Sequence, residues 1–188
     1  TGVQTCALPI LELQLLARTV QQNQFYEEDA VWGYSESPFT KTKHRFILNL
    51  LPNSVLSGLD AACQASNLIL RAVFPPTVYL RRQLQDLPIE PEDAVLLAAE
   101  TPGALYLLAG HGNGKLLFAR SLSASSLSDR ERIEQEINRT LLYAQQQFGV
   151  AVKHVYLLGR QLDRTLEGYQ PREGVSFGCV VPANDPYF

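Results

Sequence analysis

Hydrophobic residues in the C-terminal half of the chain form short runs separated by turns and by one long amphipathic stretch. The apolar runs span residues 94–99, 104–109, 116–119 and 155–158. Short apolar runs bounded by turn residues predict buried strands. Between the third and fourth runs, hydrophobic residues recur at helical spacing from Asp129 to Phe148, which predicts one long helix. Three strands, a crossover helix and a returning strand indicate one half of a layered α/β domain.

The long helix carries signals at both ends. Ser128 fits the N-cap, and Glu131 stands where it completes a capping box. Gly149 follows the helix at the position where a left-handed residue commonly ends one. The predicted buried stripe consists of Ile133, Ile137, Leu141, Ala144 and Phe148.

The remaining segments predict smaller elements. Helices are expected at 11–23, 53–67, 76–87 and 161–168, and strands at 31–34, 45–51, 68–73 and 175–181. Two prolines and two acidic residues make Leu87–Glu92 the best candidate for a linker.

Composition is that of an ordinary soluble globular protein. The 188 residues are 46% hydrophobic and 19% charged with a net charge of −3, so no basic excess points to nucleic acid. No apolar run approaches the roughly 18 to 20 residues that a membrane span requires. The three cysteines, Cys6, Cys63 and Cys179, lack metal-ligand spacing and indicate a reducing compartment.

The first ten residues, TGVQTCALPI, resemble a translated sequencing adapter. The alternative is the hydrophobic part of a signal sequence, but a basic start is lacking. The chain also contains no methionine. We interpret residues 1–10 as an artefact and expect a truncated N-terminus.

The glycine-rich turn Gly110–Gly114 is the first candidate for chemistry. Such a turn can cradle phosphate where it opens a helix. This one joins two apolar runs, and Asn113-Gly114 is a common hairpin dipeptide, so a hairpin is favoured. Neither a GxxxxGK[ST] motif nor a GxGxxG motif after a strand is present.

The other candidate side chains have simpler interpretations. His44 and His154 each precede a strand and are interpreted as surface or edge residues, while Cys63 is predicted to be a small buried residue. Cys179 has no evident base, and the serines of 121–128 fit a loop that ends in an N-cap. We therefore predict no catalytic residues and no metal site.

Five segments resemble the PilM family of actin-like proteins from type IV pilus assembly, which is related to MshI and to the cytoplasmic domain of GspL. In chain order they are Leu16–Val31, Leu48–Leu56, Leu59–Leu70, Leu116–Leu122 and Glu134–Tyr143. The most specific is the last, EQEINRTLLY, which is similar to the family's helix pattern EIrRtLdYy.

This resemblance implies an α/β fold of actin-like, ribonuclease H-like architecture with mixed sheets and flanking helices. Residues 11–87 would be the remnant of the first actin-like half with a small α+β insertion, and residues 93–181 the second half. The implied function is a non-catalytic cytoplasmic scaffold of type IV pilus or type II secretion assembly. It would link the assembly ATPase to inner-membrane protein partners, peripheral to that membrane and without contact to nucleic acid.

Departures from the family pattern concern the nucleotide site. Members that bind ATP carry Asp-x-Gly and small hydroxyl residues at the first turn of the second half, where this chain has AAETPGA at 98–104. No Asp is available there to organise a metal-bound phosphate, and Pro102 removes a backbone donor. The positions left from that site are Glu100, Thr101, Gly103 and Gly159. We expect no cofactor, neither ATP nor Mg²⁺.

Two alternatives stay open. One is an ATP-binding PilM-type protein whose phosphate-binding parts are partly missing from this fragment. The other is an unrelated enzyme that uses His111 or Cys179. The run ILNLLP at 47–52 nearly matches the INLLP peptide that PilM partners present, but we interpret it as part of a strand.

Overall fold

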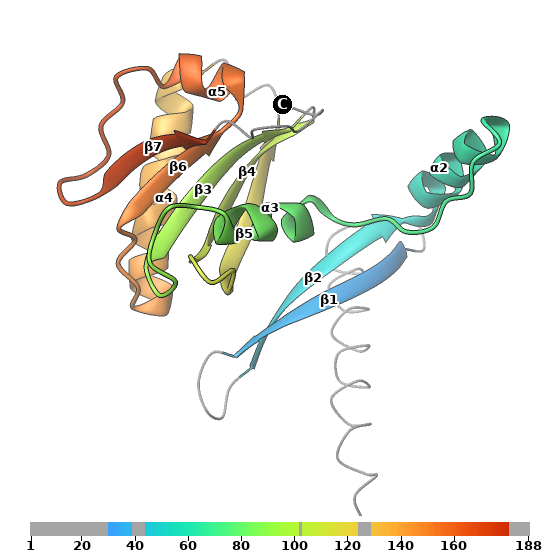
Figure 1. The fold of residues 1–188 in the computed structure, drawn as a ribbon, viewed down its shortest axis with the longest axis horizontal. Helices are drawn as coiled ribbons and strands as arrows, with labels where there is room; N and C mark the ends of the chain where they lie inside the picture. Colours follow the sequence, from blue (N-terminus) through green and yellow to red (C-terminus); the bar gives the residue numbers. More distant parts are fainter. Residues whose placement is uncertain (1–29, 39–43, 102, 124–128, 181–188) are drawn as a thin grey trace, which may run out of the picture. The chain divides into compact units, whose positions relative to one another are not determined.

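The computed structural model describes residues 30–38, 44–101, 103–123 and 129–180 (Figure 1). The chain forms two compact units, Thr1–Val73 and Phe74–Phe188. The predicted helix at 11–23 and residues 1–10 lie outside the described residues, so both interpretations stay predictions.

The boundary between the compact units differs from the predicted linker at Leu87–Glu92. Helix α3 (Pro76–Gln85) belongs to the second unit, where it contacts strands β3 and β4, described below. Its residues Leu80 and Leu84 are fully buried. Local composition does not show whether a helix packs on a sheet that follows it in the chain. The division into actin-like halves at 11–87 and 93–181 stays a prediction, but the compact units divide after Val73.

The first unit contains an antiparallel strand pair followed by a helix. Strand β1 (Ala30–Pro38) pairs with β2 (His44–Pro52), and helix α2 (Asn53–Ala65) begins directly after Pro52. The predicted strands and helix are therefore confirmed. None of the residues of α2 is fully buried, and Cys63, predicted to be buried, is only partly so.

The strand predicted at residues 68–73 is wrong. This segment has no regular secondary structure, and Leu68 and Ile69 are 61% and 76% exposed. A strand is stabilised by hydrogen bonds to a neighbouring strand, so an apolar run that pairs with none gains nothing from that conformation.

The second unit is built on a five-stranded mixed sheet with the strand order β5-β4-β3-β6-β7 (Figure 1). Strands β3, β4 and β5 are antiparallel neighbours, whereas β6 runs parallel to β3 and β7 parallel to β6. Their bounds are β3 (Ala94–Thr101), β4 (Ala104–His111), β5 (Leu116–Ser123), β6 (His154–Leu158) and β7 (Ser176–Val180). All five predicted strands of this unit are confirmed, and with them the predicted mixed α/β sheet.

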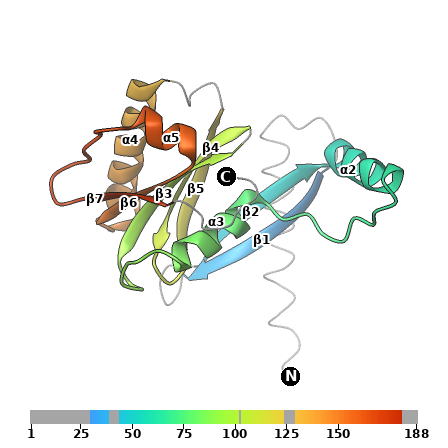
Figure 2. The ribbon, with the colours of Figure 1, turned by 45° about the horizontal axis from the view of Figure 1, so that its top comes forward.

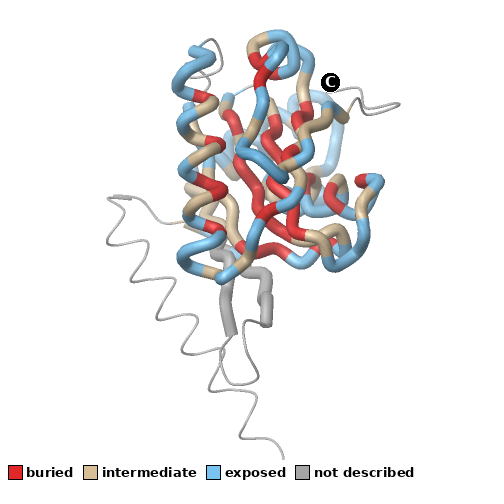
Figure 3. The backbone as a smooth tube through the Cα atoms, turned by 90° about the vertical axis from the view of Figure 1, so that its left-hand side faces the viewer, coloured by how far each residue is buried: buried red, intermediate tan, exposed pale blue. Residues whose placement is uncertain are grey.

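Helices cover both faces of this sheet (Figure 2). Helix α4 (Arg130–Phe148) and the short helix α5 (Arg160–Thr165) pack on one face, and α3 packs on the other. Leu96 and Ala98 of β3 join the core cluster beneath α4. The alternating residues Val95 and Leu97 are also fully buried. Strand β3 is thus buried on both faces, which explains its unbroken apolar run. Figure 3 shows that buried residues gather in the central strands.

The ends of α4 are set by two residues. The N-cap is Asp129 rather than Ser128, which lies outside the described residues: Asp129 Oδ1 accepts a hydrogen bond from the Arg132 backbone N–H at 3.1 Å. Ser and Asp are both good caps, so the sequence pattern favoured Ser128 with Glu131, whereas the structure uses the next residue. Gly149 follows the helix in the left-handed conformation, with a φ of 65°, as predicted.

Replacing Asp129 by Ala is expected to lower the free energy of unfolding by about 1 kcal/mol, because the first turn of α4 loses its side-chain acceptor. Asp129→Asn keeps an oxygen at the same place and should lose much less. Urea denaturation followed by circular dichroism measures both. Equal losses in the two variants would contradict the assignment of Asp129 as the cap.

Candidate functional site

The sequence-predicted site residues lie around the carboxyl ends of β3 and β6. These strands are parallel, with Ala99 opposite Leu158, so Glu100 and Gly159 extend from the same edge of the sheet. In open α/β sheets, ligands characteristically bind at this edge.

Glu100 and Gly159 are brought into direct contact. Glu100 Oε2 accepts hydrogen bonds from the backbone N–H groups of Gln161 and Leu162, both at 3.0 Å. These two groups belong to the first turn of α5, whose N–H groups have no partner within the helix. The Glu100 carboxylate therefore satisfies donors that would otherwise be available to another acceptor.

Thr101 and Gly103 do not join this contact. The Thr101 hydroxyl donates to the Ala104 carbonyl at 2.9 Å and so closes the turn between β3 and β4. A Cβ placed on Gly103 would meet no heavy atom within 4 Å. Of the four predicted positions, the structure thus brings together Glu100 and Gly159, whereas the Thr101 hydroxyl bonds within the turn between β3 and β4.

The start of α5 does not fit a phosphate while Glu100 binds there. The two backbone donors at the start of α5 already bind a carboxylate, which would repel a phosphate held at the same place. Among the described residues, no group of three or more His, Cys, Asp and Glu side chains could hold a metal ion. No step through ATP or Mg²⁺ follows from this arrangement.

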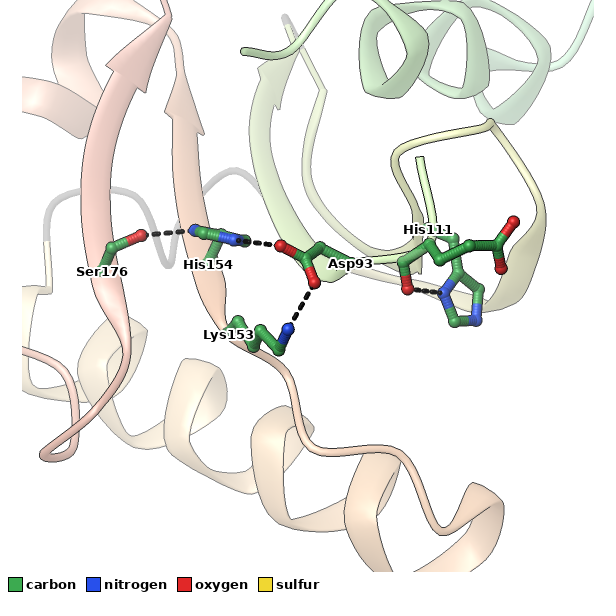
Figure 4. Close-up of polar contacts among 6 residues, drawn as sticks. Asp93, His111, Lys153, His154 and Ser176 are labelled. Atoms are coloured by element: carbon green, nitrogen blue, oxygen red, sulfur yellow. Dashed lines mark hydrogen bonds and ion pairs between the residues drawn. The ribbon is translucent and has the colours of Figure 1, made fainter. Parts of the chain in front are cut away.

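The glycine-rich turn is the hairpin between β4 and β5, as predicted. The Gly112 and Asn113 backbone N–H groups donate to the Asp93 and Pro91 carbonyls at 3.1 and 2.8 Å. His111 Nδ1 lies 3.0 Å from the Glu92 carbonyl oxygen (Figure 4). Because its backbone donors bind the segment before β3, this turn has a structural role.

Cys179 lies on β7 as a protonated thiol. Its Sγ donates to Asp163 Oδ1 at 2.7 Å. Burial, followed by this hydrogen bond and the Asp163 charge, raises the pKa of Cys179 to about 11. The thiolate required of a nucleophile is therefore scarce at neutral pH.

Sequence analysis missed a polar cluster at the starts of three strands, comprising Asp93, Lys153, His154 and Ser176 (Figure 4). Asp93 Oδ1 accepts from Lys153 Nζ at 2.5 Å, and Asp93 Oδ2 lies 3.2 Å from His154 Nε2. His154 Nδ1 lies 2.6 Å from Ser176 Oγ. The only sequence signal was that these residues stand at strand starts.

Side-chain hydrogen bonds in this cluster connect the starts of β3, β6 and β7. His154 is directly opposite Ser176 in the β6–β7 pairing, and the Lys153 backbone N–H donates to the Ala94 carbonyl. Hydrogen bonds from Lys153 and then from His154 lower the pKa of Asp93. Its ionised form is thus favoured in the folded state.

Replacing Asp93 by Asn is expected to lower the melting temperature at neutral pH. A lowered carboxyl pKa stabilises the fold above the unfolded value of about 3.9, and this contribution is lost as pH falls through the folded value. The difference between wild type and variant should therefore shrink as pH falls below about 4 and vanish only below the lowered pKa of Asp93. Thermal denaturation across pH, with Asp86→Asn at an exposed site as control, measures it. A difference independent of pH would contradict the role of the ionised carboxylate.

A second contact joins two segments of the family resemblance. Arg120 of β5 forms a salt bridge with Glu136 of α4, and Glu136 also pairs with Arg139 at 2.8 Å. Burial, with a smaller contribution from the Arg139 charge, lowers the pKa of Arg120. The pair fixes α4 to the edge strand of the sheet.

Comparisons with known proteins give similarity in structure. No protein-family model matches the sequence, and no curated protein matches it. A solved structure of the PilM–PilN type IV pilus biogenesis complex matches 92% of this chain with a TM-score of 0.65 and 16% identity. A Bacteroides thetaiotaomicron protein with an actin-like ATPase fold and unknown function matches 90% with a TM-score of 0.50 and 16% identity.

The fold is actin-like. The predicted architecture is thereby confirmed. The chain spans 62% and 61% of the lengths of the two similar chains. In the part of the actin-like chain that the structure describes, no helix is long and apolar enough to cross a bilayer.

Proposed function

We propose that this chain is a non-catalytic assembly protein of a type IV pilus system. The observation that carries the proposal is the shared fold with a chain of the PilM–PilN complex over 92% of the sequence. In this role it would be cytoplasmic and held at the inner membrane by protein partners, where it links the assembly ATPase to those partners. The resemblance to GspL allows a type II secretion system, but the similar structure comes from a pilus complex, which favours the pilus.

The described side chains support binding rather than turnover. The His111 ring lies at a carbonyl oxygen in a hairpin turn, and the Cys179 thiol is held protonated beside Asp163. Asp163 raises the pKa of the thiol instead of activating it, and the His111 ring contacts a carbonyl oxygen, so neither contact favours a nucleophile. The cluster of Asp93, His154 and Ser176 joins strand starts, away from the carboxyl edge where ligands of such sheets bind.

The partner we propose is the cytoplasmic segment of a PilN-type inner-membrane protein. A segment that binds an actin-like chain in extended form gains affinity from main-chain hydrogen bonds and specificity from side-chain pockets. Ordering of the segment on binding costs free energy, so its affinity is expected to be lower than the buried area alone would give.

Binding to the PilN-type segment encoded in the same genome tests this function. The chain would be titrated with that segment by isothermal calorimetry, with a scrambled segment as control. Saturable binding of the native segment alone is expected. Failure of both segments to bind, together with a gene neighbourhood free of pilus and secretion genes, would overturn the assignment.

An ATP-binding PilM-type protein is the second candidate, because one similar structure is described as having an actin-like ATPase fold. Tight binding of Mg-ATP to a version of the protein that includes the whole fold would favour it. Such binding would remove the non-catalytic role but would leave the assignment to pilus assembly in place.

A further inference from the structure

The carboxylate of Glu100 lies at the edge of the sheet where ligands of open α/β sheets characteristically bind. It lies at the carboxyl end of β3 and accepts hydrogen bonds from the first two residues after Arg160 in α5, Gln161 and Leu162. Backbone N–H groups at the start of a helix are common donors to phosphates and carboxylates. Here the acceptor is supplied by the chain itself, 61 residues before Gln161.

Gly159 makes this contact geometrically feasible. Its φ is 136°, a conformation that favours glycine, and it lies directly against the Glu100 side chain. A Cβ built on Gly159 would lie 2.6 Å from Glu100 Oε2 and would also overlap Glu100 Cβ. The backbone after β6 is therefore closed over the carboxylate, with no room for a side chain between them.

We propose that Glu100 is a built-in anion that occupies the donors at the start of α5 and keeps nucleotide phosphates away from this edge of the sheet. Two physical effects act together. The Gln161 and Leu162 N–H groups are used, and a phosphate that approached them would meet a carboxylate of like charge. The backbone donors at the start of α5 thus bind a side chain of the same protein instead of a ligand.

This inference stands on the Glu100 geometry and does not depend on the partner-binding role. It also gives Glu100 a second effect, since the contact ties α5 to the end of β3. Helix α5 has only the residues Arg160–Thr165, so an acceptor for its first turn stabilises a segment that is too short to be stable alone.

Amide hydrogen exchange, resolved by NMR, tests the contact. In Glu100→Ala, exchange at Gln161 and Leu162 should become faster by about tenfold or more, because both N–H groups lose a charged acceptor. Glu100→Gln keeps an oxygen without the charge and should give an intermediate rate. Glu173→Ala removes the same charge from an exposed position and should leave both rates unchanged.

The same spectra test the exclusion of nucleotide. Titration of wild type with Mg-ADP should produce no saturable shift at residues 159–162. Saturable shifts there, or exchange rates in Glu100→Ala equal to those of wild type, would overturn the inference. If Glu100→Ala does not fold, the rates in Glu100→Gln and the wild-type titration still decide it.

The two proposals fail separately. Nucleotide binding at residues 159–162 would remove the role of Glu100 and leave the partner titration unaffected. Loss of the predicted partner binding would leave the Glu100 contact intact.

Discussion

Replacing Ile137 by Ala should lower the free energy of unfolding of the second unit by about 2 to 5 kcal/mol. Ile137 lies in the middle of α4 and is fully buried against the sheet, in one cluster with Leu96, Leu107 and Leu157. Truncation removes apolar contacts and leaves a cavity that the strands close only in part, because each is held in register by its neighbours.

Gln146→Ala is the matched control for Ile137→Ala. It changes an exposed residue of the same helix and should alter stability by no more than about 0.5 kcal/mol. Urea denaturation of both variants, followed by circular dichroism, gives the comparison. Losses of the same size would show that α4 does not pack on the sheet through this face.

Replacing Gly159 by Ala should cost about 2 to 4 kcal/mol, since strain and crowding act together. An alanine would be forced to a φ of 136°, and its Cβ would overlap the Glu100 side chain. Relief requires Glu100 to leave the Gln161 and Leu162 N–H groups. The substitution should therefore speed amide exchange at both residues as well as lower stability.

Gly103→Ala provides the control for Gly159→Ala. Gly103 lies in the turn after β3, and an added Cβ would meet no heavy atom within 4 Å among the described residues. Its effect should be within about 0.5 kcal/mol, and loss of freedom in the unfolded chain would favour a small gain. Thermal denaturation of the two alanine variants separates them. Equal melting temperatures would contradict the close contact between Gly159 and Glu100.

The elements of the second unit could be predicted because the burial of an element determines the spacing of its hydrophobic residues. Strand β3 is enclosed on both faces, so residues 94–99 are all apolar, whereas α4 is buried along one stripe and repeats its hydrophobic residues at helical spacing. The turn at Gly110–Gly114 was likewise predictable, because tight hairpin turns favour Asn-Gly and Gly114 adopts a positive φ.

Prediction failed where an element depends on a distant partner. Residues 68–73 have the composition of a strand, yet composition does not state whether a neighbouring strand exists. The same reason explains why the compact units divide after Val73 and not at the candidate linker, since α3 belongs to the unit whose sheet buries Leu80 and Leu84. The N-cap of α4 is one residue later than predicted, because Ser and Asp side chains offer the same hydrogen-bonding chemistry.

By itself the sequence determined the strand and helix order of the second unit, its mixed α/β class and the positions Glu100 and Gly159 at strand ends. Only the tertiary structure decided what those positions do. The parallel register of β3 and β6 brings Glu100 to the start of α5, and the same pairing, continued to β7, gathers Asp93, His154 and Ser176. Local spacing records which face of an element is buried, but contacts between residues some 60 positions apart arise only when the sheet is assembled.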